Sequence, residues 1–195
     1  MRNIYIIVVM LLYALLLVGC GGGVGAPGSS GGDDTGVVIQ SATLTVDSPD
    51  IDTIIDRCSP TTVEKGLTRT SGTLNVAAAP LVPGSTDDPF NGASIQQCTI
   101  TYKKANEDPA APIIETLTIY PNCTLVNGTT TCDVTVMDVE RKTKWGNDIL
   151  GGTFTPAEDP THYVAVFDCK YVTSFGETGT FKAEIDIWLS DFNRC

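Results

Sequence analysis

The chain has a single histidine among its 195 residues, and this scarcity limits the chemistry that it can perform. A Ser-His-Asp or Cys-His nucleophilic site would have to use His162, which stands in DPTHYVAV next to a turn. With one histidine and no C-x2-C pair, a zinc site is not expected, and no C-x-x-C-H sequence offers a haem attachment. We therefore expect no cofactor and interpret His162 as a surface or strand-edge residue.

Positive charge is also scarce. There are 12 Lys and Arg against 23 Asp and Glu, which gives a net charge of −11. Nucleic acid and anionic head groups repel so acidic a protein, so we expect no nucleic-acid partner. The chain contains no G-x-S-x-G motif, no P-loop and no G-x-G-x-x-G in a βαβ setting. We expect a non-catalytic protein. An enzyme whose active site matches no familiar motif is the less favoured alternative.

One long apolar run is present, residues 4–18, which carry no charge and follow Arg2. A membrane span needs roughly 20 apolar residues, whereas this run has the length of a signal-peptide core. It ends in LVGC at Cys20, and these residues resemble the lipobox of bacterial lipoproteins. The resemblance implies removal of residues 1–19 as a signal peptide and a diacylglycerol on Cys20, often with a further acyl chain (palmitate). An ordinary secretory signal or an uncleaved anchor are the alternatives, and both still export the chain.

Glycine dominates the stretch that follows Cys20. Residues 21–36 contain eight glycines and too few apolar side chains to fold, so we expect a flexible tether over 20–36. Random-coil scaling gives this tether a reach of about 20–24 Å. The residue after Cys20 is glycine, not the aspartate that retains enterobacterial lipoproteins in the inner membrane. The resemblance therefore implies a lipid-anchored protein of the bacterial cell envelope, at the outer membrane.

Apolar and polar side chains alternate with a period of two through residues 37–195, which we interpret as one domain. The clearest case is TFKAEIDIWL, where Phe181 and Ile185 share one face and Trp188 lies on the other. Similar runs occupy 41–46, 94–102, 115–120 and 131–139, whereas 162–171 is more continuously apolar, as in a strand near the middle of a sheet. Turn signals separate them, TKWGND at 143–148 among these. The pattern predicts an all-β fold: an antiparallel β-sandwich of the immunoglobulin-like type with seven to nine strands. A β-barrel is the alternative, and no long helix is expected.

Six cysteines remain once Cys20 is assigned to the lipid, and an even number in an exported chain implies disulfides. They are Cys58, Cys98, Cys123, Cys132, Cys169 and Cys195. Cys123 and Cys132 bracket an Asn-Gly turn signal, so we expect a bridge across that hairpin.

The other four cysteines are harder to pair from the sequence. Cys58 and Cys195 lie outside the regular alternation, so we expect them to fasten a loop and the C-terminus. That choice leaves Cys98 with Cys169 across the sandwich.

Two tryptophans are candidates for ligand contact, because an exposed aromatic ring can stack on a sugar or anchor a partner. Trp145 stands in a predicted turn, and Trp188 lies on the polar face of the last strand by parity. Coverage by a neighbouring loop is the alternative for each ring. These residues are the basis for a possible glycan partner.

Carboxylates gather in three loops. Asp47, Asp50 and Asp52 are weak candidates for a calcium site, which needs six to eight oxygen ligands, and otherwise no metal is expected. Asp87 with Asp88, and Glu158 with Asp159, form similar acidic pairs, which an exported acidic protein also carries for solubility.

These observations together favour a lipid-anchored envelope protein whose β-sandwich is a non-catalytic binding or structural module for a protein partner or envelope assembly. A carbohydrate-binding module is the alternative. Because sandwiches host many functions, the fold alone does not choose between them.

Overall fold

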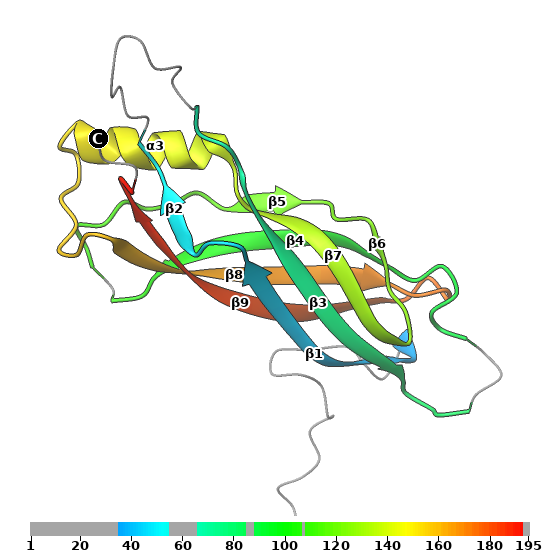
Figure 1. Cartoon of the computed structure of the whole chain (residues 1–195). Coiled ribbons are helices and arrows are strands. Elements are labelled where there is room, and N and C mark those ends of the chain that lie inside the picture. The colour runs from blue at the N-terminus through cyan, green and yellow to red at the C-terminus, as the bar shows by residue number, and fades with distance from the viewer. Residues whose placement is uncertain (1–34, 55–65, 85–87, 107, 193–195) are drawn as a thin grey trace, which may run out of the picture.

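The computed structural model describes residues 35–54, 66–84, 88–106 and 108–192. Within these ranges the chain forms two β-sheets and one helix, which lies at one end of the strands (Figure 1). The elements are β1 (Val37–Val46), β2 (Asp50–Asp52), β3 (Thr70–Pro80), β4 (Ser94–Lys104), β5 (Leu117–Ile119), β6 (Cys123–Thr124), β7 (Gly128–Met137), α3 (Val139–Leu150), β8 (Thr161–Val172) and β9 (Thr178–Ser190). The expectation of a mainly β fold is confirmed.

The smaller sheet has the strand order β1-β3-β7 and is antiparallel throughout. β1 changes its inward parity because its register shifts between Ile39 and Ser41. Val37 and Ile39 are buried before this irregularity, and Leu44 is buried after it. In a regular strand Leu44 and Ile39 would face opposite sides of the sheet. The bulge therefore allows both halves of β1 to bury apolar side chains.

β3 is the central strand of this sheet, yet it lies outside the ranges that alternation predicts. Its inward positions include Leu74 and Val76, and they do alternate with polar or small residues. Three successive alanines precede the last residue of the strand, Pro80, and they provide little hydrophobic contrast between its two faces. The periodic signal is weak for this reason, although the strand is 11 residues long.

The larger sheet has the order β2-β9-β8-β4-β5, with β6 also paired to β4. The long antiparallel strands β4, β8 and β9 are neighbours, and the sheet curls into a half-barrel (Figure 1). Its inner face carries large buried rings, including Tyr163, Phe167 and Phe181. These rings belong to one core cluster with Leu74 and Val76 of the smaller sheet, so the two sheets share a single core.

One short helix, α3, covers residues 143–148, where the sequence predicted a turn, so that prediction was wrong. The carboxylate of Asp138 caps the helix by accepting a hydrogen bond from the Arg141 backbone N–H at 2.9 Å. Gly146 is typical of a turn in sequence, but here it is buried inside the helix. A Cβ added to Gly146 would lie 2.3 Å from the Thr53 carbonyl oxygen. Glycine is therefore required where α3 packs on the chain that follows β2.

The disulfides Cys98–Cys169 and Cys123–Cys132 are both present, which confirms the two predicted pairings. Their places in the fold are the reverse of those expected. Cys98 and Cys169 lie opposite each other on β4 and β8, so this bridge joins neighbours within one sheet and does not cross the core.

The bridge expected across a hairpin instead links the two sheets. Cys123 lies on β6, which pairs with β4 of the larger sheet, and Cys132 lies on β7 of the smaller one. The chain does turn at Gly128, whose φ of 108° suits glycine. The two strands around that turn then join different sheets. Cys20, Cys58 and Cys195 lie outside the described residues.

Candidate functional site

The outer face of the larger sheet brings together His162, Asp186 and Trp188. His162 and Trp188 are directly opposite on β8 and β9, and their rings stack with centroids 4.7 Å apart and planes 9° apart. His162 Nε2 lies 2.8 Å from Asp186 Oδ1. Trp188 is on the outer face, as its parity predicts, and is half-buried. The imidazole covers one face of its indole ring, which leaves less of the ring for a ligand.

A cavity of about 250 Å³ adjoins His162 and is lined by both polar and apolar residues (the His162 cavity). Its lining includes Lys104, Asn106, Asp108, Glu158, Thr161 and His162. The Asn106 side-chain amide donates to Glu158 Oε2 at 2.8 Å, which ties two loops together across the cavity. Cation, amide and carboxylate groups in one place suit a small polar ligand.

Asp108 fixes one wall of the His162 cavity. Its carboxylate accepts hydrogen bonds from the backbone N–H groups of Ala157 and Ala110, each at 2.8 Å. These bonds, that of Ala157 first, hold the pKa of Asp108 below its usual value. The sequence did not predict Lys104, Asn106 or Asp108 as site residues. The available signal was NEDPAAP, which predicts only a turn.

His162 is the histidine that a nucleophilic site would have to use. Among the described residues its imidazole is hydrogen-bonded to Asp186, and no serine, threonine or cysteine side chain bonds to it. A nucleophile and its base must lie within hydrogen-bond reach. The residue sits at the start of β8, next to the turn, as the strand-edge interpretation predicts.

Trp145 corrects the prediction of an exposed ligand contact. It is only 4% exposed and belongs to α3, with its indole N–H donating to the Tyr163 hydroxyl at 3.1 Å. That hydroxyl donates in turn to the Pro112 carbonyl at 2.8 Å. Burial raises the pKa of Tyr163 to about 12. This chain of hydrogen bonds joins the helix, β8 and the segment before β5, so Trp145 has a structural role.

A second cavity, of about 240 Å³, lies between α3 and the ends of β8 and β9. It is lined in part by Trp145, Ile149 and the carboxylate residues Glu158, Asp159 and Asp191. The Ser190 hydroxyl donates to Asp159, which fixes one side of this opening. Glu158 also lines the His162 cavity, so the loop before β8 separates the two.

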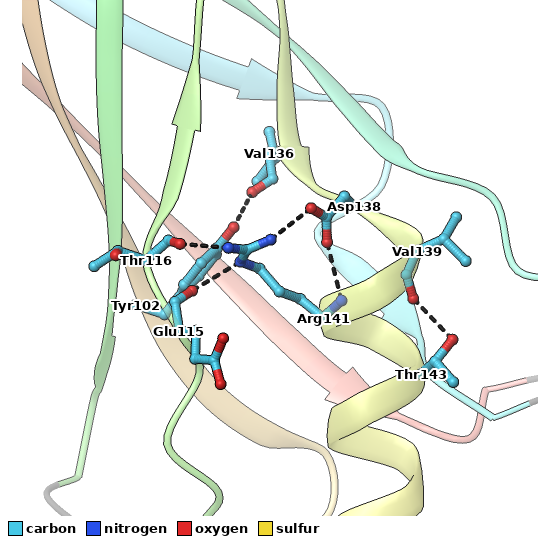
Figure 2. Close-up of polar contacts among 8 residues, drawn as sticks. All are labelled: Tyr102, Glu115, Thr116, Val136, Asp138, Val139, Arg141 and Thr143. Carbon is cyan, nitrogen blue, oxygen red and sulfur yellow. Dashed lines mark hydrogen bonds and ion pairs between the residues drawn. The ribbon is translucent and has the colours of Figure 1, made fainter.

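Arg141 forms the densest polar cluster near the helix (Figure 2). Its Nε donates to the Glu115 carbonyl at 2.8 Å, one terminal nitrogen donates to the Thr116 carbonyl, and the other lies 2.5 Å from Asp138 Oδ2. Beside it, the Tyr102 hydroxyl donates to the Val136 carbonyl at 2.6 Å. Burial raises the pKa of Tyr102 well above its usual value. These groups fasten the start of α3 to the chain before β5.

The acidic candidates for calcium are not gathered into a site. Asp50 and Asp52 lie on the short β2, and the Asp52 carboxylate accepts from the Ile54 backbone N–H at 3.4 Å. Asp47 lies in the preceding bend. In the part of the chain that the structure describes, no three His, Cys, Asp or Glu side chains are grouped to hold a metal ion.

The acidic pair at 87–88 is described only in part. Asp87 lies outside the described residues, whereas the Asp88 carboxylate accepts from the Phe90 backbone N–H at 3.0 Å. The Asp88 backbone carbonyl also accepts from the Ser174 hydroxyl, which ties this loop to the turn between β8 and β9. Across the described ranges, no helix is both long enough and apolar enough to cross a membrane.

No protein-family model matches this chain, and no curated protein matches it. Two solved structures are distantly similar. A Northeast Structural Genomics Consortium target has 15% identity and a TM-score of 0.27, with 83% of this chain and 92% of that chain covered. A putative late embryogenesis abundant (LEA) protein has 17% identity and a TM-score of 0.32, covering 78% of this chain and 73% of that one. At these TM-scores neither likeness bears on the function.

Proposed function

We propose that this chain is a lipid-anchored protein of the bacterial cell envelope, at the outer membrane. Its β-sandwich of the immunoglobulin-like type is a non-catalytic binding or structural module for a protein partner or envelope assembly. The observation that carries the proposal is LVGC ending at Cys20, followed by the glycine-rich residues 21–36 and then by a disulfide-bonded β domain. Lipid attachment, spacer and folded module follow one another in the order that such a protein needs.

The disulfides support export. Such bonds form and persist in oxidising compartments and are rare in the cytosol. One of them joins neighbouring strands and the other joins the two sheets, so both take part in holding the domain together. A periplasmic or surface location is consistent with this requirement.

The contacts of the candidate chemical groups support a binding role over catalysis. Arg141 donates hydrogen bonds to two backbone carbonyls and to Asp138, the residue that caps α3. The hydrogen bond between Trp145 and Tyr163 joins the helix to the sheet. His162 is stacked on Trp188 and bonded to Asp186. Each group stabilises a rigid framework, which is what a recognition module presents to a partner.

The test is crosslinking in intact cells, followed by purification through a C-terminal tag, with the native chain compared to Cys20→Ala. A stoichiometric protein partner that is lost in Cys20→Ala is the expected result. Recovery of the chain without any protein partner would contradict the binding role. Absence of lipid on Cys20 by mass spectrometry would contradict the anchor itself.

A carbohydrate-binding module is the second candidate, and the half-buried Trp188 beside the His162 cavity favours it. Sugars bind to aromatic rings next to polar side chains. Tryptophan fluorescence across a glycan panel tests this, and the buried Trp145 provides a constant background. A fluorescence change on addition of a glycan that disappears in Trp188→Phe supports glycan binding. Unchanged fluorescence across the panel contradicts the carbohydrate-binding proposal.

A further inference from the structure

Exposed apolar side chains gather at the end of the molecule remote from α3. In the described part of the chain nine large hydrophobic side chains are exposed, and four of them lie on loops at this end: Leu81, Val82, Val126 and Phe175 (the apolar end). Val82 is 63% exposed and Phe175 is 55% exposed. Apolar side chains grouped on a surface in this way mark an interaction site, whereas single ones need no explanation.

Hydrogen bonds hold the loops of the apolar end against one another. The Ser174 backbone N–H donates to the Pro89 carbonyl at 3.2 Å, which ties the turn between β8 and β9 to the loop after β3. A cavity of about 450 Å³ lies beside them, with Val82 and Val126 both in its lining. The four apolar side chains are therefore carried by loops that pack together.

The described chain enters the domain at this same end. Gly36 accepts a hydrogen bond from the Leu81 backbone N–H at 2.9 Å, and a Cβ on Gly36 would lie 3.7 Å from the Phe175 ring. Figure 1 shows β1 beginning at this end and α3 lying at the other. The 12 residues of β8 run between the two ends, a distance of about 36 Å.

The proposed lipid site is close to this end along the chain. Cys20 precedes Thr35 by 15 residues, and their glycine-rich composition predicts a mean reach of about 20 Å. That reach is shorter than the distance between the two ends of β8. The apolar end is therefore the part of the domain nearest to a membrane in which Cys20 is anchored.

The charge around the apolar end selects the kind of lipid surface. Asp88 and Glu177 are exposed beside it, and the loops 80–92, 125–129 and 172–178 contain no lysine or arginine. Carboxylates are repelled by anionic head groups, so apolar contact with a zwitterionic surface is favoured.

We infer that the apolar end rests on the membrane that holds the lipid anchor, with Val82 and Phe175 inserted at the level of the zwitterionic head groups. This inference rests on the proposed function, because the anchor brings the surface within reach. Insertion at one end of the strands orients the domain with α3 directed away from the bilayer. The end carrying α3 and the two smaller cavities is then presented to partners.

The test uses the full lipidated chain, unaltered, in phosphatidylcholine vesicles that contain a lipid with a photoreactive diazirine in its acyl chain. After illumination, labelled peptides are mapped by mass spectrometry, and intact mass reports the lipid on Cys20. Ile113 and Leu150 are the matched controls, because they are 74% and 69% exposed but lie toward the helix end. We expect several-fold more label on the peptides that carry Val82 and Phe175 than on those that carry the controls.

Two variants make the outcome specific to the apolar end. Phe175→Asp should reduce labelling there several-fold, whereas Leu150→Asp should leave it unchanged, and both positions are exposed enough to accept aspartate. Label spread equally over both ends, or crosslinks at the apolar end to a second protein chain, would overturn the inference. A lipidated Cys20 with no label at the apolar end would overturn the inference and leave the anchor intact. Absence of lipid on Cys20 would overturn both.

Discussion

Replacing Gly146 by alanine tests how α3 is attached to the sheet. In an exposed helix interior this change stabilises by about 1 kcal/mol, because glycine loses more backbone entropy than alanine. Here the added Cβ would lie 2.3 Å from the Thr53 oxygen and 3.2 Å from its carbonyl carbon. Reaching an ordinary contact requires a movement of about 1 Å.

Thr53 has little freedom to provide that movement. Its backbone N–H and its hydroxyl both donate to the Ser190 carbonyl, at 3.1 Å and 3.0 Å, which fixes it to the end of β9. Overpacking of this kind costs up to about 3 kcal/mol. Because Thr53 is fixed, we take the upper value, and subtracting the helix gain of about 1 kcal/mol then leaves a net destabilisation of about 2 kcal/mol.

The assay is urea unfolding with the disulfides intact, followed by far-ultraviolet circular dichroism in a Cys20→Ala background. A loss of about 2 kcal/mol lowers the midpoint by about 1 M for a typical urea dependence. Asn147→Ala is the control, because it adds the same residue at an exposed neighbouring position and should stabilise by about 0.5 kcal/mol. A Gly146→Ala protein as stable as the parent would refute the close packing of α3 on Thr53.

Three further predictions concern stability. Removing Cys98–Cys169 should lower the free energy of unfolding by about 4.4 kcal/mol and removing Cys123–Cys132 by about 2.6 kcal/mol, because their loops span 71 and 9 residues. Equal losses of stability in urea unfolding would contradict this entropic ranking. Tyr163→Phe should cost about 1–3 kcal/mol by leaving the buried Trp145 N–H without its acceptor, and an unchanged midpoint would exclude that role. The third prediction concerns pH. Burial raises the pKa of the Tyr163 hydroxyl from 10.0 to about 12, so between pH 10 and pH 12 the hydroxyl is ionised in the unfolded chain but still protonated in the folded one. The contribution of Tyr163 to stability is therefore complete below pH 10 and decreases up to about pH 12. The urea midpoint of the parent should fall more steeply over this range than that of Tyr163→Phe, and equal slopes would argue against this contribution.

Local patterns were enough to predict most of the strands and the Cys123–Cys132 disulfide, whereas Cys98–Cys169 was predicted by elimination of the other cysteines. Alternation in β9 is regular because one face is buried in the core and the other is solvated, so a period of two appears in the sequence. β8 is apolar without a break from residue 163 to residue 167, and Val166 is buried as well, as in a strand inside a sheet. β3 was missed because alanines on both faces weaken that contrast. The helix was missed because Gly146 and Asn147 are typical of turns, and the need for glycine arises from Thr53, which is more than 90 residues away in sequence.

The candidate site could be predicted less well. The outward parity of Trp188 follows from its strand, but its stacking on His162 depends on the register between β8 and β9. Trp145 was a candidate ligand contact, with coverage by a loop as the alternative, because its helix was not recognised, and the structure buries it against Tyr163. The His162 cavity combines β4, the loop after it and the loop before β8, a combination that no local pattern contains.

The sequence by itself determined the β character of the domain, the pairing of Cys123 with Cys132 and the excess of acidic residues, because each depends on composition or on short-range patterns. Tertiary structure alone decided which disulfide joins the two sheets, why Gly146 must be glycine, and that the exposed apolar loops meet at the end where the chain enters. The physical reason is that these features depend on contacts between segments far apart in the chain. Such contacts are fixed by strand register and packing, and a linear pattern carries no record of them.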